Sequence, residues 1–347
     1  MDDKKSFLII TNELPINNTG GANIRNFFFI KELSKYYNVT LLSFVGKKDK
    51  AQSLSDLENI CEVIIIPSFF GSYLFKIFLL RRNLKKILLK RNFNYIQVEH
   101  SEFGDVLNGV KTDSMKILDF HNVDSYAIGL DKNIFDMHVC CSVYEKEKLN
   151  NLRYKNIIVV PNGVDVEYFH FDKNTDKQKS ILFIGRLKYR PNIEGIKYFI
   201  KEIFPLLGIN IKLNIIGEYD DKDFINERKI KNVNFLGFVD DIRPYFNNSI
   251  FICPILHGNG TRLKILTAFA NGAPVVSTSK GAEGVDYVDE ENILIADSPI
   301  LFKDKILKLI NEPVFLEKNI QNARKLAEEQ YDWKIIMENY KNELNKL

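Results

Sequence analysis

The residues best suited to chemistry lie between two apolar runs, in the segment 251–276. A glycine-containing loop at 258–260 precedes a helical pattern that begins at Thr261 and carries Arg262 and Lys264 in its first turn. Free amides at a helix start, two full positive charges and a backbone that a ligand can approach closely together favour phosphate. The segment therefore predicts a diphosphate site, although an ordinary glycine-containing turn of a parallel sheet has the same pattern.

The ends of this helix are predicted from residue type. The Thr261 hydroxyl can accept a hydrogen bond from a free amide of the first turn, so Thr261 suits the cap position. Gly272 suits the left-handed residue that stops a helix, and the apolar residues after it predict a strand. The expected order is strand, loop, helix and strand.

Short apolar runs alternate with helical patterns through the first half of the chain. A helix is expected to begin at Gly20 and Gly21, where a ligand can approach the backbone. The strand-like runs occupy 7–11, 39–45, 62–66, 95–98, 115–120, 137–141 and 157–160. Such alternation is typical of a doubly wound parallel sheet.

A second alternation follows the polar stretch 172–179, where we expect a domain boundary. Its strand-like runs occupy 181–184, 211–216, 233–236, 250–253 and 293–295, with a helix at 192–204. The last segment, from Trp333, has an apolar face at helical spacing. The sequence thus predicts an α/β protein with two doubly wound parallel sheets.

The segment 73–91, which begins at Tyr73 and ends at Arg91, predicts a long basic helix. Its apolar residues recur at helical spacing, while Arg82, Lys86 and Lys90 follow one another on another face with no acid among them. A solvated basic face is one reading of this pattern. Contact with an anionic lipid surface or an anionic acceptor is the other.

Composition excludes several classes of protein. The 48 basic and 45 acidic residues leave a net charge of +3, so the overall charge does not indicate a nucleic-acid partner. The four cysteines lie in apolar runs without metal spacing, which indicates a reducing compartment. Without a signal-peptide core or a bilayer-long apolar run, we expect a cytoplasmic protein, and the basic helix leaves open a position on the inner face of the membrane.

Several short motifs follow one another in order: PNGVD from Pro161, LFIGRL from Leu182, PN at Pro191, NIIG from Asn214, FLGFVDD from Phe235, GNGTRLKIL from Gly258 and ANGAPVVST from Ala270. Each is weak alone, but their order and spacing resemble the GT-B glycosyltransferases, specifically the retaining family-4 type (glycosyl transferases group 1). The Gly20-Gly21 loop, DFHNVDS from Asp119 and CSVYEKEKL from Cys141 are similar to the acceptor-side half of that family.

The resemblance implies two Rossmann-like domains that face each other across a cleft. Residues 1–171 would form the acceptor-side domain and residues 172–331 the nucleotide-sugar donor domain. Residues 332–347 would form a helix that crosses back to the first domain. Ligands of open α/β sheets bind beyond the carboxyl ends of the strands, and Arg186, Asn259 and His121 each follow such an end.

The resemblance also implies residue roles. Arg186 follows a strand and Gly185, and its guanidinium can pair with two diphosphate oxygens. The second charge would come from Lys188 or Lys264, and the sequence leaves that choice open. The expected catalytic residues are His121, Arg186 and Lys264. The expected donor-binding residues are Gly20, Gly21, Gly185, Lys188, Gly258, Asn259, Gly260, Thr261, Arg262 and Thr267.

His121 matches a histidine that in the family contacts the donor sugar beside the reaction centre. The alternative is a structural histidine that is hydrogen-bonded near Asp119 or Asp124. His100 and His257 have the same general claim with weaker support, and no two histidines have metal spacing, so no metal or other cofactor is expected.

The chain departs from the family where two glutamates usually stand, because Asn259 and Thr267 occupy those positions. A carboxylate can accept hydrogen bonds from both ribose hydroxyls, whereas threonine cannot accept both with comparable strength. We therefore expect a retaining, metal-free glycosyltransferase that uses a nucleotide-diphosphate sugar and a glycan or lipid-linked acceptor. The alternative is a catalytically weakened subunit of a glycan-assembly complex. A NAD-binding oxidoreductase fits less well, because the three-glycine fingerprint is missing.

Overall fold

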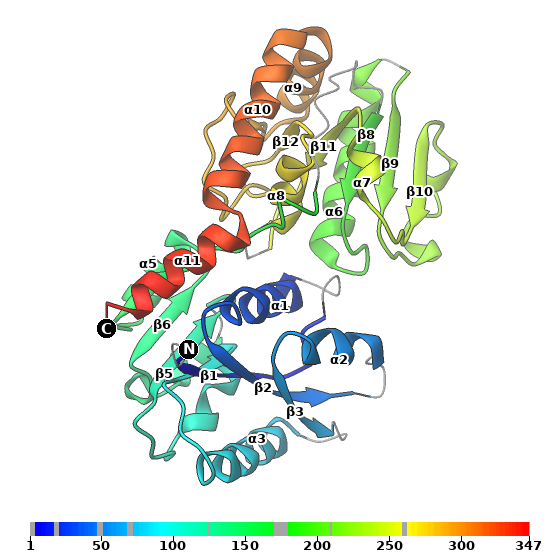
Figure 1. Ribbon diagram of the computed structural model, residues 1–347. Helices are drawn as coiled ribbons and strands as arrows, with labels where there is room; N and C mark the ends of the chain where they lie inside the picture. Colours follow the sequence, from blue (N-terminus) through cyan, green and yellow to red (C-terminus); the bar gives the residue numbers. More distant parts are fainter. Residues whose placement is uncertain are drawn as a thin grey trace. The chain divides into compact units, whose positions relative to one another are not determined.

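The computed structural model describes residues 4–16, 21–46, 51–67, 72–123, 125–169, 180–208, 210–258 and 262–346. The chain divides into two compact units. Unit 1 comprises Met1–Asn162 together with Trp333–Leu347, and unit 2 comprises Gly163–Asp332 (Figure 1). The boundary expected at 171/172 lies outside the described residues, and the division falls earlier, at Asn162 and Gly163.

Unit 1 is built on a 7-stranded parallel sheet with the order β3-β2-β1-β4-β5-β6-β7. The chain order reverses between β1 and β4, and such a switch point opens a crevice at the carboxyl ends of the strands. The strands are β1 (Ser6–Thr11), β2 (Asn38–Val45), β3 (Glu62–Pro67), β4 (Tyr95–Glu99), β5 (Met115–Phe120), β6 (Met137–Cys140) and β7 (Ile157–Val159).

Helices cover both faces of this sheet, which is why its central strands are apolar on both sides. One core contains the buried residues of α1, α2 and α11, and the other contains those of α3, α4 and α5. The bounds are α1 (Gly21–Leu33), α2 (Ala51–Glu58), α3 (Tyr73–Leu88), α4 (Ser125–Gly129), α5 (Val143–Asn151) and α11 (Trp333–Leu344). The Trp333 ring stacks on Phe28 with centroids 5.4 Å apart, so the last helix packs on α1 in unit 1.

Unit 2 repeats this plan with a 6-stranded parallel sheet of order β10-β9-β8-β11-β12-β13. Its switch point lies between β8 and β11. The strands are β8 (Ser180–Ile184), β9 (Lys212–Ile216), β10 (Val233–Gly237), β11 (Ser249–Cys253), β12 (Val275–Ser277) and β13 (Leu294–Ile295). The helices are α6 (Arg190–Tyr198), α7 (Arg243–Phe246), α8 (Leu263–Ala270), α9 (Pro299–Asn311) and α10 (Pro313–Gln330).

The two sheets confirm the predicted doubly wound α/β architecture. Gly272 has a φ of 69°, as predicted for the residue that stops α8. The predicted cap, Thr261, lies outside the described residues, and the cap position is instead taken by Arg262, whose side chain does not cap the helix. No helix in the described ranges combines the length and the apolar character that crossing a bilayer demands.

Candidate active site

The carboxyl edge of β8 in unit 2 carries the first of the expected cations. Arg186 follows β8 and Gly185, and its side chain is exposed. Among the described residues, none forms a hydrogen bond or ion pair with its guanidinium. The Glu218 carboxylate lies near enough for the charge of Arg186 to lower its pKa, but its direct partner is Lys188. Arg186 is therefore held at the edge by its backbone while its charge remains available.

Lys264 lies half-buried in the first turn of α8. Its Nζ donates a hydrogen bond to Asn192 Oδ1 over 2.9 Å and lies 4.6 Å from the centroid of the Phe183 ring. Asn192 Nδ2 in turn donates to the Arg186 carbonyl over 2.9 Å, which ties α8 to the loop after β8. Burial, with a smaller contribution from the neighbouring positive charge of Arg262, lowers the pKa of Lys264 to about 8. No carboxylate in the described ranges pairs with this ammonium group.

The glycine at Gly185 makes this arrangement possible. A Cβ there would lie 2.6 Å from Lys264 Nζ and 2.9 Å from Asn192 Nδ2, so a larger residue would displace both groups. Gly217, on the neighbouring strand end, has a φ of 141°, and a Cβ there would collide with the Gly185 carbonyl. Gly217 is thus required for the close approach of the two backbone segments, and Gly185 leaves room for Lys264 and Asn192 beside the strand end.

The remaining expected donor residues of unit 2 have different environments. Lys188 is exposed and forms an ion pair with Glu218, so it differs from Lys264, which has no counter-ion among the described residues. The Thr267 hydroxyl donates to the Leu263 carbonyl one turn earlier in α8, over 3.1 Å. His257 forms an ion pair with Glu194 on the surface.

Part of the expected site lies outside the described residues, namely Gly20, Asn259, Gly260 and Thr261. Gly21 is the first residue of α1. Gly258 has a φ of 105°, and a Cβ there would lie 3.2 Å from the Tyr189 hydroxyl and 3.4 Å from Arg262 Nη2. Gly258 therefore lies close to Arg262, the residue at the start of α8.

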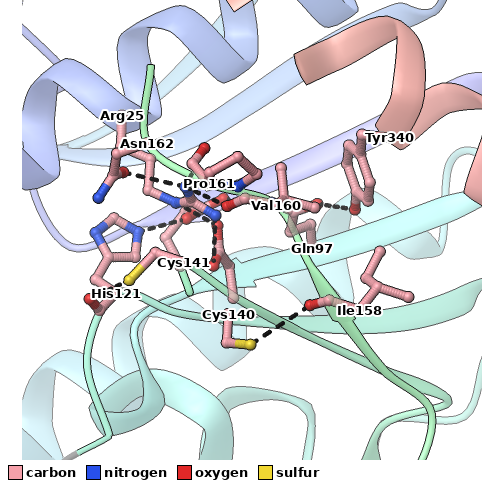
Figure 2. Close-up of polar contacts among 12 residues, drawn as sticks. Arg25, Gln97, His121, Cys140, Cys141, Ile158, Val160, Pro161, Asn162 and Tyr340 are labelled. Carbon is pink, nitrogen blue, oxygen red and sulfur yellow. Dashed lines mark hydrogen bonds and ion pairs between the residues drawn. The ribbon is translucent and has the colours of Figure 1, made fainter. Parts of the chain in front are cut away.

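The carboxyl edge of the unit 1 sheet contains a buried charge pair that the sequence did not indicate. Arg25 of α1 donates two hydrogen bonds to Asp119 at the end of β5, Nε to Oδ2 over 2.9 Å and Nη2 to Oδ1 over 3.1 Å. Its Nη1 also donates to the Val160 carbonyl over 2.9 Å and to Asn162 Oδ1 over 3.1 Å (Figure 2). A fully buried guanidinium is thus satisfied on all sides, as such a group must be.

His121 lies directly after β5, and its partner is Glu99 at the end of β4. His121 Nε2 lies 2.8 Å from Glu99 Oε2. The Glu99 carboxyl is fully buried, and burial raises its pKa to about 7, whereas burial lowers the pKa of His121 to about 4. The neutral imidazole is therefore the form present near neutral pH. Its Nδ1 is buried and accepts or donates no hydrogen bond within the described part of the chain.

His100 adds a conformational peculiarity beside His121. It adopts a φ of 73°, which is uncommon for a residue with a side chain, and its ring centroid lies 3.9 Å from that of His121. A strained backbone conformation persists only where the surrounding structure holds it in place, and such residues are concentrated at functional sites. The edge between β4 and β5 is thus a constrained, polar part of unit 1.

Glu99, Asp119 and His121 bring potential ligand atoms within 4.8 Å of one another. Two hydrogen bonds from Arg25 already occupy Asp119, and the buried guanidinium charge would repel a cation. We therefore interpret the cluster as a hydrogen-bonding network. That the reaction needs no metal stays a prediction.

Sequence reasoning found Arg186, Lys264 and His121 because each follows a strand or begins a helix. It missed Glu99, Arg25 and Asn192. Glu99 could have been found, because Glu99 and His121 each come directly after a predicted strand, 95–98 and 115–120. Asn192 offered no signal beyond its position after Pro191.

Comparison with known proteins gives a class that agrees with this geometry. Residues 178–312 match the family model described as Glycosyl transferases group 1. An uncharacterized 44.6 kDa protein in the cps region of Klebsiella pneumoniae is 26% identical over 294 residues, which are 74% of this chain and 75% of that protein. The capsular polysaccharide biosynthesis glycosyltransferase CapM of Staphylococcus aureus is 27% identical over 220 residues, 57% of each chain.

Solved structures share the whole fold at low identity. A glycosyltransferase from Rickettsia africae has a TM-score of 0.79 with 14% identity, covering 99% of this chain and 100% of that one. The Anabaena protein HepE in complex with UDP has a TM-score of 0.77 with 14% identity and the same coverage. The fold is therefore GT-B, with two Rossmann-like units. The chain is therefore a glycosyltransferase, and residues 178–312 in unit 2 match the group 1 family model.

Proposed function

We propose that this glycosyltransferase is a retaining enzyme that transfers a sugar from a nucleotide-diphosphate sugar to a glycan or lipid-linked acceptor in cell-surface polysaccharide assembly. The named role of CapM in capsular polysaccharide biosynthesis and the cps-region relative support this pathway class. The complex of HepE with UDP supports a nucleotide-linked donor.

The observation that carries the proposal is a group of cations at the carboxyl edge of unit 2, of which Arg186 and Lys264 have no carboxylate partner among the described residues. Arg186 is exposed beside the strand end, and Lys264 contacts the neutral Asn192 amide and the Phe183 ring. Next to Lys264 is Arg262, at the start of a helix without a side-chain cap. Holding like charges close together is costly unless an anion binds between them, and a diphosphate satisfies both the charges and the free amides.

In the proposed reaction, the bond between the anomeric carbon and the diphosphate oxygen breaks, and the diphosphate leaves with the bonding electrons. Arg186, Lys264 and Arg262 stabilise the charge that develops on it. The acceptor hydroxyl then bonds to the anomeric carbon from the face that the diphosphate leaves, and its proton passes to a leaving phosphate oxygen. His121 is assigned to a hydroxyl of the donor sugar through Nδ1. No protein carboxylate is assigned as a nucleophile.

A thermal-shift panel tests the donor assignment. A nucleotide sugar at 100 times its dissociation constant should raise the free energy of unfolding by about 2.7 kcal/mol. We expect stabilisation by one nucleotide-sugar class, and product formation with a chelator present. A flat panel would contradict the donor site, and chelator-sensitive transfer rescued by a divalent ion would contradict the metal-free mechanism.

We further propose that the protein binds an anionic membrane surface through α3 and reaches its acceptor there. The exposed side of this helix carries Leu74, Phe75 and Phe78, with exposed fractions of 74%, 43% and 57%. The exposed cations Arg82, Lys85, Lys86 and Lys90 continue along the same segment without any acid. Exposed aromatic and aliphatic groups beside a run of cations are the two signals that reversible binding to acidic lipid requires.

A further inference from the structure

His121 can play its assigned role only if its ring presents the correct nitrogen. A neutral imidazole has one N–H donor and one acceptor, and the hydrogen bond at one nitrogen decides which is which. Here Nε2 lies 2.8 Å from Glu99 Oε2, and Nδ1 is the nitrogen without a described partner. The state of Glu99 therefore determines what Nδ1 offers.

Glu99 is itself held by a chain of hydrogen bonds that begins in the last helix. The Tyr340 hydroxyl of α11 donates a hydrogen bond to Gln97 Oε1 over 2.6 Å. Figure 2 includes this contact. Gln97 Nε2 then donates to Glu99 Oε1 over 2.7 Å. A phenol that donates to the amide oxygen leaves the amide NH₂ directed at Glu99, and this orientation favours the ionised carboxylate.

We propose that Tyr340 and Gln97 are positioning residues for His121. Through Glu99 they hold the imidazole in the tautomer with the proton on Nε2, so that Nδ1 accepts a hydrogen bond from a ligand hydroxyl. The identity of that hydroxyl as a donor-sugar hydroxyl rests on the proposed function, whereas the tautomer does not.

Other charged and polar groups also face this carboxylate and act on its ionisation. Arg25 of α1 stabilises the ionised form of Glu99, and the Asp119 carboxyl of β5 is a second acid close enough to affect its ionisation. His100 lies against the imidazole. Burial opposes the ionisation of Glu99 and raises its pKa to about 7. The preference of His121 for the Nε2–H tautomer is therefore strong above neutral pH and weakens as Glu99 takes up a proton.

The test is nitrogen-15 NMR of the imidazoles in the full chain, which has 5 histidines. His121→Gln identifies the His121 signal. We expect the Nε2–H tautomer at pH 8 and a change in the Nδ1 signal as Glu99 is protonated. Glu99→Gln should abolish that change. Gln97→Met removes a hydrogen bond to the charged carboxylate and should raise the pH midpoint of the change by about one pH unit or more. Tyr340→Phe acts through Gln97 and should raise it by about half a pH unit, the size expected for one neutral hydrogen bond.

Tyr37→Phe is the matched control, because Tyr37 is a buried tyrosine of the same core whose hydroxyl has no hydrogen-bond partner within the described residues. It should leave the midpoint unchanged. Equal midpoints in Tyr340→Phe and Tyr37→Phe, or an Nδ1–H tautomer at pH 8 in the wild type, would overturn the proposal. Gln97→Met gives the same readout should Tyr340→Phe fold poorly.

Donor binding separates this proposal from the proposed function. The NMR readout needs neither donor nor acceptor. The tautomer of His121 can behave as expected while His121→Ala binds the nucleotide sugar as tightly as the wild type. In that case Tyr340 and Gln97 do set the tautomer, but the assignment of the ligand hydroxyl to the donor sugar is wrong. If binding weakens tenfold or more in both His121→Ala and Glu99→Gln, both assignments are supported.

Discussion

The two units have the same topology at their switch points but differ in whether the charged side chains there are paired. At the edge of unit 1, Arg25 is paired with Asp119, and Glu99 is bonded to Gln97 and His121. At the edge of unit 2, no described carboxylate pairs with Arg186 or Lys264. Among the described residues, the charged groups of the first edge are paired with one another and His121 Nδ1 is left without a partner, whereas those two cations of the second edge have no paired carboxylate. Mutations at the first edge should therefore cost stability, and mutations at the second should cost function.

The largest effect is expected from breaking the buried pair of unit 1. Arg25→Met leaves the Asp119 carboxylate buried without its cation, so the free energy of unfolding should fall by about 3–5 kcal/mol. Urea denaturation measures this. Arg228→Met is the control, because the Arg228–Asp221 pair is exposed and should contribute less than about 1 kcal/mol. Equal losses in the two variants would refute the contrast.

A comparable effect is expected for lipid binding. In unit 1 the exposed positive charge lies on and just after α3, and not at the carboxyl edge of the sheet. Each lysine or arginine near an acidic surface is worth about 1 kcal/mol, so reversing Arg82, Lys86 and Lys90 to glutamate should weaken partitioning at least about 100-fold. Sedimentation with phosphatidylglycerol vesicles measures this.

The matched control reverses three exposed lysines of unit 2, Lys201, Lys222 and Lys229, which changes the net charge equally. It should bind like the wild type. Phe75→Ser with Phe78→Ser should weaken binding even in low salt, whereas Phe238→Ser, with a side chain 72% exposed, should not. Binding by wild type and α3 variants alike would leave only a solvated helix face.

At the edge of unit 2 the expected losses are kinetic. Arg186→Ala removes one charge-assisted contact with the leaving diphosphate, which should raise the activation free energy by about 3 kcal/mol, or roughly 100-fold in turnover. Because the side chain is exposed and has no described partner, the free energy of unfolding should change by less than about 0.5 kcal/mol. Normal turnover in the folded variant would remove Arg186 from the mechanism.

A smaller effect is expected at Thr267, whose hydroxyl proton is already engaged by the Leu263 carbonyl. If the donor carries ribose, Thr267→Glu should tighten binding by about 1–3 kcal/mol, since a carboxylate can accept from both hydroxyls. If the donor carries deoxyribose, the new charge would lack a partner and binding should weaken. Titration of both proteins with UDP, GDP and dTDP distinguishes these cases, and no binding by either would contradict the site.

The smallest effect concerns pH. Burial lowers the pKa of Lys264 to about 8, so its ammonium charge is present below that pH and is lost as pH rises through it. Affinity for the nucleotide sugar should thus weaken by up to about tenfold between pH 7 and pH 9. Lys264→Arg should bind equally at both values because its guanidinium stays protonated. A wild-type affinity that does not change with pH would exclude the charge of Lys264 from binding.

Much of this contrast could be predicted from the sequence, but only where the determinant is local. The positions of the strands follow from apolar runs, and Arg186 and His121 come directly after two of them. The partners of His121 and Lys264 could not be predicted in the same way, because Glu99 and Asn192 are distant in sequence and meet them only through strand pairing and helix packing.

The basic helix shows a second limit. Helical spacing correctly indicated that Ile77, Leu80 and Leu84 are buried. It did not indicate that Phe75 and Phe78 are exposed, because a helix rich in apolar residues on several sides does not reveal which side the sheet covers. Only the packed structure decides this.

The return of α11 to unit 1 has a consequence for biosynthesis. Trp333 and Tyr340 complete a core whose other members, such as Phe28 and Phe29, are synthesised before unit 2. A ribosome delivers the chain in order, so unit 1 stays open on one face while all of unit 2 is synthesised. Its aromatic residues must wait for residues 333–344 before they are covered. On this face, unit 1 is therefore completed only after unit 2 has been synthesised.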